Sequence, residues 1–158
     1  MRTAQRRIVT AYIVSTDGKI LLGKKDPTKG GVYPDCLHNP GGGVDVGESD
    51  EGALCREVIE ETGVDIRFAQ KTLIDTSGIG QSEKTLKTGE KIVVEMHFYV
   101  FRVDLGKASD KVELYPRSDL IDLQWYPIEE LEQLKLTPPA VKLIALRGID
   151  WLTGAYNR

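Results

Sequence analysis

The sequence predicts an α+β fold in which helices cover both faces of one mixed β-sheet, an αβα sandwich. Stretches rich in Ile, Val, Thr and aromatic residues are interspersed with segments of helical periodicity, a pattern typical of a sheet with helices packed on it. The 158 residues are close to the usual size of one domain, and no repeat, low-complexity run or linker divides them. We therefore expect residues 1–158 to form a single domain.

Composition and charge narrow the class of protein. The net charge is -3, which argues against a general nucleic-acid binder because such proteins are normally basic. Cys36 and Cys55 form no CxxC pair and predict no disulfide framework. The apolar stretch RIVTAYIV (7–14) is too short and too interrupted for a signal sequence or a membrane span. We expect a reduced, soluble, cytoplasmic protein that binds neither nucleic acid nor a membrane.

The first part of the chain predicts strands joined by turns. Residues 6–15 are rich in β-branched and aromatic residues, and Asp17–Gly18 is a strong hairpin turn that leads to a partner strand over 19–25. Residues 26–35 are dense in Gly and Pro and predict a loop. A short strand over 36–39 then leads into a run of three glycines.

The second half predicts three more strands and two helices. The expected strands cover 64–75, 91–104 and 120–126, a short helix opens at Pro127, and a last helix opens at Pro138 and Pro139. Residues 76–90 are polar and predict a long loop or an irregular hairpin, and residues 105–119 predict another loop. The last helix is expected to carry Val141, Ile144, Ala145, Ile149 and Leu152 near helical spacing, although Gly148 weakens it.

One helix is expected at about 50–62. Ser49 is a plausible N-cap, acidic residues follow it in the first turn, and Gly63 fits the position that ends a helix. Its apolar side is expected to consist of Leu54, Cys55, Val58 and Ile59.

Three carboxylates lie close together near the C-terminal end of this helix, where acids are unfavourable. Glu57, Glu60 and Glu61 stand at i, i+3 and i+4 in the last two turns, where the helix dipole is negative. Each like-charge pair costs about 0.2–0.5 kcal/mol, and the dipole adds about 0.3–1 kcal/mol per acid. An acidic helix end is usually a solvated face, but a bound cation would relieve this crowding. Hard oxygen ligands suit Mg²⁺ or Mn²⁺.

The glycines at 41–43 precede the helix and let the backbone approach a ligand or a metal closely. The alternative is a tight turn without function. Two phosphate-binding patterns are excluded, because GxGxxG would need glycine where Val46 stands and no GK[ST] occurs.

The spacing around these residues resembles the Nudix box. Gly42 is followed by five residues and Glu48, then by seven residues and the run Arg56 to Val64, in which every defined position of that box matches. Nine defined positions at fixed spacing make a strong signal, although the box covers only residues 42–64. The wider order of strands, long loops and a final helix is also similar to that of the Nudix hydrolase family, of which MutT is a member.

The resemblance implies a Mg²⁺- or Mn²⁺-dependent pyrophosphohydrolase that cleaves the P–O–P bond of a nucleoside diphosphate linked to another group. Some relatives carry proline or tyrosine about sixteen residues after the box when they act on ADP-ribose or dinucleoside polyphosphates. Residues 77–80 hold neither, which leaves a nucleoside triphosphate as the default and an NDP-sugar, ADP-ribose or dinucleoside polyphosphate as alternatives. A nucleotide-binding sensor without turnover is a further alternative, and an RNA decapping enzyme is disfavoured by the acidic balance. The resemblance leaves a homodimer open.

The resemblance also implies roles for single residues. Glu57, Glu60 and Glu61 would be the metal carboxylates, with the Gly41 carbonyl as a further ligand. Arg56 would hold the glutamates or the loop by ion pairing, and Glu48 would tie the loop to the helix.

For the general base and the substrate contacts, the sequence leaves several candidates. The general base would be Glu60 or a later acid, with Asp119 the first candidate and Glu113 the second. Lys24 and Lys25 end a strand where relatives often carry a basic residue facing the phosphates. His38, His97, Tyr33, Phe98 and Trp125 are weaker candidates, for which packing is the simpler interpretation except at Tyr33.

Overall fold

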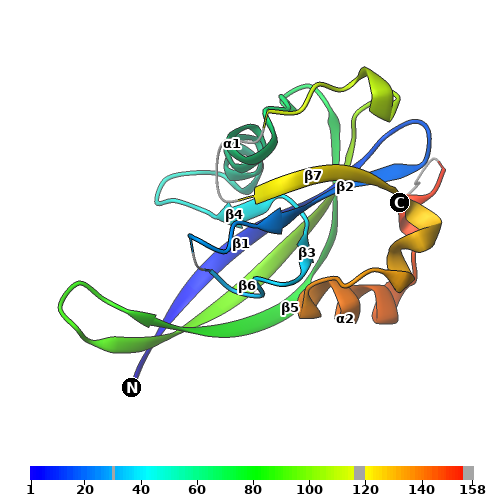
Figure 1. Ribbon diagram of the computed structural model, residues 1–158. Helices are drawn as coiled ribbons and strands as arrows, with labels where there is room; N and C mark the ends of the chain where they lie inside the picture. Colours follow the sequence, from blue (N-terminus) through cyan, green and yellow to red (C-terminus); the bar gives the residue numbers. More distant parts are fainter. Residues whose placement is uncertain (30, 116–119, 155–158) are drawn as a thin grey trace.

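A computed structural model describes residues 1–29, 31–115 and 120–154. Figure 1 shows a twisted sheet with α1 (Asp50–Thr62) on one face and α2 (Pro138–Arg147) on the other. The sheet has seven strands in the order β3-β2-β1-β6-β5, with β4 paired to β1 and β7 paired to β2. The expected mixed sheet between helices is confirmed.

The centre of the sheet is a parallel pair. β1 (Arg2–Val14) runs beside β6 (Lys91–Asp104) over its whole length, and β5 (Gln70–Thr85) pairs antiparallel with the other edge of β6. On its opposite edge, β1 carries the three-residue strand β4 (Gly41–Gly43). The glycine run is therefore fixed to the middle of the first strand.

The other half of the sheet is antiparallel. β2 (Lys19–Lys25) pairs with β7 (Leu120–Pro127) and with the short β3 (Leu37–His38). Three short 3₁₀ helices complete the described chain: η1 (Ser109–Lys111), η2 (Ile128–Gln133) and η3 (Asp150–Leu152).

The two faces of β1 serve two separate cores. Val9, Ala11 and Ile13 pack with α1 in one hydrophobic cluster. Tyr12 and Val14 pack with α2 and with the 3₁₀ helices η2 and η3 in the other. Side chains alternate across a strand, so a strand that is apolar at successive positions belongs in the middle of such a sandwich.

The predicted hairpin between residues 6–15 and 19–25 is only partly correct. The tight turn at Asp17–Gly18 forms, with Gly18 at a φ of 76°. In the described structure, however, β1 and β2 are paired at a single position, where Val14 lies opposite Ile20. Beyond the turn β2 pairs with β7, and β1 pairs with β4 and β6. Because β1 is apolar on both faces, the long parallel pairing with β6 buries more of it than a two-stranded hairpin would.

The helix predicted at about 50–62 is confirmed. The Ser49 side chain accepts a hydrogen bond from the Gly52 N–H at 3.0 Å, and Gly63 ends the helix in the left-handed conformation with a φ of 77°. Ala53, Leu54 and Val58 form the buried side of the helix. Cys55 is half-buried against the same core, and both cysteines are free.

Two other predictions need correction, and a third is confirmed in one of its two alternatives. The strand expected over 64–75 begins only at Gln70, because the chain turns with Ile66 buried. Residues 76–90 form the predicted irregular hairpin rather than a loop, with bulges near Asp75 and a turn that closes at Leu86 and Glu90. The last helix ends at Arg147 rather than continuing to Leu152, since Gly148 caps it with a φ of 70°.

The other expected elements are found. The strand over 91–104 is β6, the strand over 120–126 is β7, and the short helix after Pro127 is the 3₁₀ helix η2. Within the described parts of the chain, every helix is too short or too polar to cross a bilayer.

Candidate active site

Each glycine of β4 leaves room for a different neighbour. A Cβ on Gly41 would overlap the Val9 carbonyl, and a Cβ on Gly42 would lie 2.5 Å from the Glu57 carboxylate carbon. A Cβ on Gly43 would overlap the Arg6 guanidinium. Real Cβ atoms essentially never come this close to other heavy atoms. The three glycines therefore bring the backbone against β1, against a helix carboxylate and against an arginine.

Arg56 connects the loop to the helix. Its Nε donates to Glu48 at 2.8 Å, its Nη1 to Glu57 at 2.9 Å and its Nη2 to the Gly43 carbonyl at 2.9 Å. Glu48 in turn accepts the Asp45 N–H at 2.8 Å. These contacts are the ties expected for Arg56 and Glu48 from the sequence. The hydrogen bonds from Arg56 lower the pKa of Glu48 to about 2, and the same contacts raise the pKa of Arg56.

The three glutamates of the helix occupy different environments. Glu61 is 3% exposed and accepts the Gly41 N–H at 2.7 Å. The Glu57 side chain is 17% exposed and lies against Gly42, while the Glu60 side chain is 51% exposed and 3.5 Å from Arg56 Nη1. The helix thus directs two carboxylates at the glycine turn and one toward solvent.

The donor chemistry at this turn fits a hard divalent cation. The Glu57 and Glu61 carboxylates both lie against β4, because Glu61 accepts the Gly41 N–H and a Cβ on Gly42 would overlap the Glu57 carboxylate. Carboxylate oxygens are hard ligands of the kind that Mg²⁺ prefers. In residues 1–29, 31–115 and 120–154, no three His, Cys, Asp or Glu side chains are clustered as a ready metal site. The metal roles of Glu57, Glu60, Glu61 and Gly41 therefore stay predictions.

A cavity of about 540 Å³ adjoins the turn. It lies between the sheet and α2, and Gly41, Gly42 and Glu61 line one part of it. Most of its wall is apolar, formed by residues such as Ile8, Met96, Phe98, Leu143 and Leu146.

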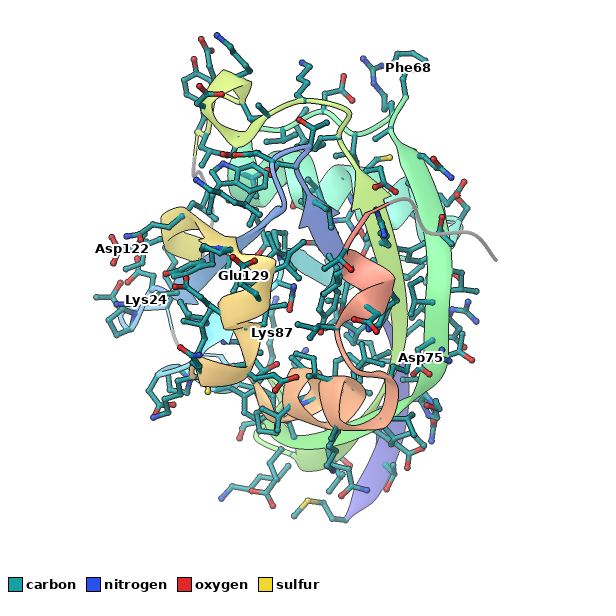
Figure 2. The ribbon with its side chains drawn as sticks, turned by 90° about the vertical axis from the view of Figure 1, so that its right-hand side faces the viewer. Lys24, Phe68, Asp75, Lys87, Asp122 and Glu129 are labelled. Carbon is teal, nitrogen blue, oxygen red and sulfur yellow. The ribbon has the colours of Figure 1, made fainter. Side chains whose placement is uncertain are left out.

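Asp75 and Ser77 add polar groups to the wall of this cavity. Asp75 accepts hydrogen bonds from the Ser77 N–H and hydroxyl at 3.0 and 2.9 Å and pairs with Arg147 at 3.1 Å. Burial acts to raise the pKa of Asp75, but these contacts outweigh it and hold the pKa below its usual value. Figure 2 shows Asp75 on β5 beside α2. The pairing of β5 with β6 is irregular on both sides of Asp75, and Asp75 is buried there. A single sequence does not predict such a bulge.

The two lysines at the end of β2 lie in different environments. Lys25 lines the cavity, whereas Lys24 is exposed and absent from its wall. Figure 2 shows Lys24 at the side of the molecule opposite Asp75. Successive residues of a strand point to opposite faces, so only one of the two can face the cavity. Of this pair, Lys25 is the better candidate for substrate binding.

Of the two later acids, the structure describes only Glu113. Asp119 lies outside the described residues. Glu113 is exposed, accepts a hydrogen bond from the Tyr115 hydroxyl and is absent from the cavity wall. The general base therefore stays a prediction, with Glu60 the candidate that the structure describes beside Arg56.

Some of the weaker candidates line the cavity and others do not. His38, Tyr33 and Phe98 line the cavity, and His38 Nε2 lies 2.8 Å from the Tyr33 carbonyl. His97 lies on β6 between Gln5 and Glu95, and Trp125 packs against the core beneath α1. Packing is thus the role of Trp125, while Phe98 both packs against a core and faces the cavity.

A family model described as the NUDIX domain matches residues 4–146. The chain belongs to the Nudix hydrolase family. The resemblance read from residues 42–64 therefore extends over most of the chain, and the protein is a Nudix hydrolase.

Relatives and solved Nudix structures agree with this assignment. Nucleoside triphosphatase NudI of Escherichia fergusonii is 30% identical over 145 residues, which cover 92% of this chain and 99% of the relative. One solved MutT chain, from a study of MutT of Aliivibrio salmonicida and Vibrio cholerae, is 23% identical with a TM-score of 0.59, covering 90% of this chain and 98% of its own. RenU, a Nudix hydrolase from M. smegmatis, is 17% identical with a TM-score of 0.68, covering 100% and 92%. Both structures share the fold of this chain.

Proposed function

We propose that this Nudix hydrolase is a nucleoside triphosphate pyrophosphohydrolase that requires Mg²⁺ or Mn²⁺. One observation carries the proposal: the carboxylates at the glycine turn adjoin a cavity with a largely apolar wall. Such a wall, with Phe98 facing inward, suits a flat nucleobase, whereas a second sugar would need more hydrogen-bonding groups. The similarity to a protein named nucleoside triphosphatase supports the same substrate class.

The proposed metal ligands are Glu57, Glu60, Glu61 and the carbonyl of Gly41. The bound metal would neutralise charge on the phosphate oxygens and orient the attacking water. Glu61 is buried and fixed by the Gly41 N–H, so it needs little reorganisation to serve as a ligand. Arg56 holds Glu57 and Glu48 with its planar fork and so acts as a positioning residue rather than a substrate contact.

The proposed reaction needs a group that takes a proton from water. Glu60 is half-exposed near Arg56, and a solvent-facing carboxylate can accept that proton and release it again. Asp119 is the alternative base. Lys25, at the wall of the cavity, is the proposed contact for a phosphate oxygen. Together these residues would bind the phosphate chain, activate water and hold the base in the cavity.

A substrate panel tests the proposed activity. Purified protein would be incubated with Mg²⁺ or Mn²⁺ and nucleoside triphosphates, NDP-sugars, ADP-ribose or dinucleoside polyphosphates, and the products separated by ion-exchange chromatography. We expect the highest kcat/KM with a nucleoside triphosphate and no turnover in EDTA. Preference for another class would reject the substrate assignment. Tight nucleotide binding without turnover would favour the sensor alternative.

A further inference from the structure

We propose that Arg6 is a phosphate-binding residue that contacts the distal phosphates of the substrate at the outer end of the glycine turn. The inference rests on the proposed function, because it assumes a substrate with a phosphate chain. It adds a residue of β1 to the site, outside the Nudix box.

The strand places Arg6 in line with the cavity. Ile8, Thr10 and Tyr12 line the cavity from β1. Residues two apart share one face of a strand, so Arg6 continues this row beyond Ile8. Thr10 is paired with Gly41 and Ile8 with Gly43. The row thus passes from the cavity, along the glycine turn, to Arg6.

Gly43 accommodates the guanidinium. An added Cβ would overlap Nη2, Nε and Cζ of Arg6 at once, so the planar group fills the space that a side chain at residue 43 would take. Gly43 has no positive φ, unlike Gly47 and Gly63. Space for Arg6, rather than an unusual backbone conformation, is what requires glycine here. On the neighbouring residue, Gly42 makes room for Glu57 in the same way.

The acids that line the cleft around Arg6 are paired with other arginines. It lies in an open cleft of about 580 Å³ that is also lined by Arg7, Asp45, Glu48 and Asp50. Arg7 pairs with Asp50 at 2.6 Å, and both other acids pair with Arg56, at 2.8 Å for Glu48 and 3.4 Å for Asp45.

Among the residues that the structure describes, no ion pair or hydrogen bond of the Arg6 side chain is recorded. A guanidinium offers a planar pair of donors that matches phosphate oxygens, and Arg6 presents one beside the turn that would hold the metal. With the base in the cavity and the cleaved bond near Glu61, the phosphates farthest from the base would lie at Arg6.

Kinetics of Arg6→Ala and Arg6→Lys test the assignment. We expect KM for the preferred nucleoside triphosphate to rise about tenfold or more in Arg6→Ala, with kcat changed far less, because a charge-assisted contact to the bound phosphates is lost. Arg6→Lys should recover part of the loss. The matched control is Arg2→Ala, an exposed arginine on the same strand that pairs with Glu90, and its KM should stay within about twofold of wild type.

Inorganic tripolyphosphate separates phosphate binding from a structural effect. We expect its inhibition constant against wild-type turnover to rise in Arg6→Ala by the same factor as KM, with an unchanged melting temperature. Calorimetric titration with tripolyphosphate and Mn²⁺ gives the same comparison without turnover. Wild-type affinity for tripolyphosphate in Arg6→Ala would overturn the assignment, whereas a wild-type enzyme inactive on triphosphates would overturn the proposed function instead.

Discussion

The carboxylate of Glu61 accepts a hydrogen bond from the Gly41 N–H at 2.7 Å, which joins the last turn of α1 directly to β4. Glu61 is buried at this point, so the position of the helix end depends on the backbone of the glycine turn. The acids that crowd the end of α1 are thus partly stabilised by the fold itself, and the carboxylates are oriented before any ligand arrives.

Glu61→Gln is expected to keep the fold and lose the activity. The amide oxygen of glutamine can still accept the Gly41 N–H, but it lacks the negative charge that a divalent cation prefers. We predict a melting temperature within a few degrees of wild type and a kcat lower by about 100-fold, the scale of losing a preorganised charge at the reacting group. Thermal denaturation and steady-state kinetics check both. Activity close to wild type would show that Glu61 is not a ligand.

Glu61→Ala is the companion variant. It also removes the acceptor of the half-buried Gly41 N–H, so it should cost more stability than the Gln variant, by about 1 kcal/mol. Equal melting temperatures for the Gln and Ala variants would contradict the structural part of this prediction.

Gly42→Ala is expected to weaken metal binding. The new Cβ would lie 2.5 Å from the Glu57 carboxylate carbon and 2.6 Å from both oxygens, so Glu57 must move away from the turn. We predict Mn²⁺ affinity lower by about 10- to 100-fold, as when a group that orients a metal ligand is lost. Mn²⁺ titration followed by electron paramagnetic resonance measures it, and circular dichroism confirms the fold. Unchanged affinity would exclude Glu57 from the metal site.

The Arg56–Glu48 contact predicts a loss of stability in acid. The pKa of Glu48 is lowered from 4.5 to about 2 in the folded protein. A group with a lowered folded pKa stabilises the protein above the unfolded pKa and stops doing so as the pH falls through the folded value. The free energy of unfolding should therefore fall between about pH 4.5 and pH 2, as measured by urea denaturation.

The variants Glu48→Gln and Arg56→Gln test this slope as a pair. Each single variant should show a shallower decline than wild type across that window, because each removes the interaction that lowers the pKa. The double variant should add little to either single one. Additive effects would mean that the two side chains do not act on each other.

Asp75→Asn is expected to loosen α2 from the sheet. Asp75 is ionised and buried on β5, and it pairs with Arg147 in the last turn of α2. Asparagine keeps the size but loses the charged contact, so we predict a loss of about 1–2 kcal/mol of stability by urea denaturation. The control Asp65→Asn removes an exposed pair with Arg67 and should cost clearly less stability, because solvent screens an exposed ion pair. Equal losses in the two variants would contradict the prediction.

The parts of the fold that sequence reasoning found are those with local signals. Ser49 and Gly63 mark the ends of α1 by their own side chain and backbone, and the spacing of Glu57 and Glu61 marks one helical face. The pairing partners of β1 and β2 were harder to predict, since pairing depends on which faces are buried by elements far along the chain. Gly148 ended the last helix where periodicity alone would have extended it.

In the candidate site too, only the residues with a local sequence signal could be predicted. The Nudix box could be recognised because its residues have fixed spacing in one segment. Asp75 could not be found from one sequence, because it lies at a strand bulge. The same holds for the position of Arg6 beside Gly43, which depends on the pairing of β1 with β4. Lys24 and Lys25 were equivalent in the sequence, and only the strand's alternation separates them.

The parallel pairing of β1 with β6 has a consequence for the order of folding. β1 leaves the ribosome well before its longest partner, β6, which ends only at Asp104. Contacts between residues so far apart form slowly because a long loop must close first. We expect a nascent chain that stops before β6 to leave one edge of β1 unpaired. The glycine turn, which is held by β1, would then become fixed only after β6 has been made, so the enzyme would acquire its active site well after the Nudix box itself has been synthesised.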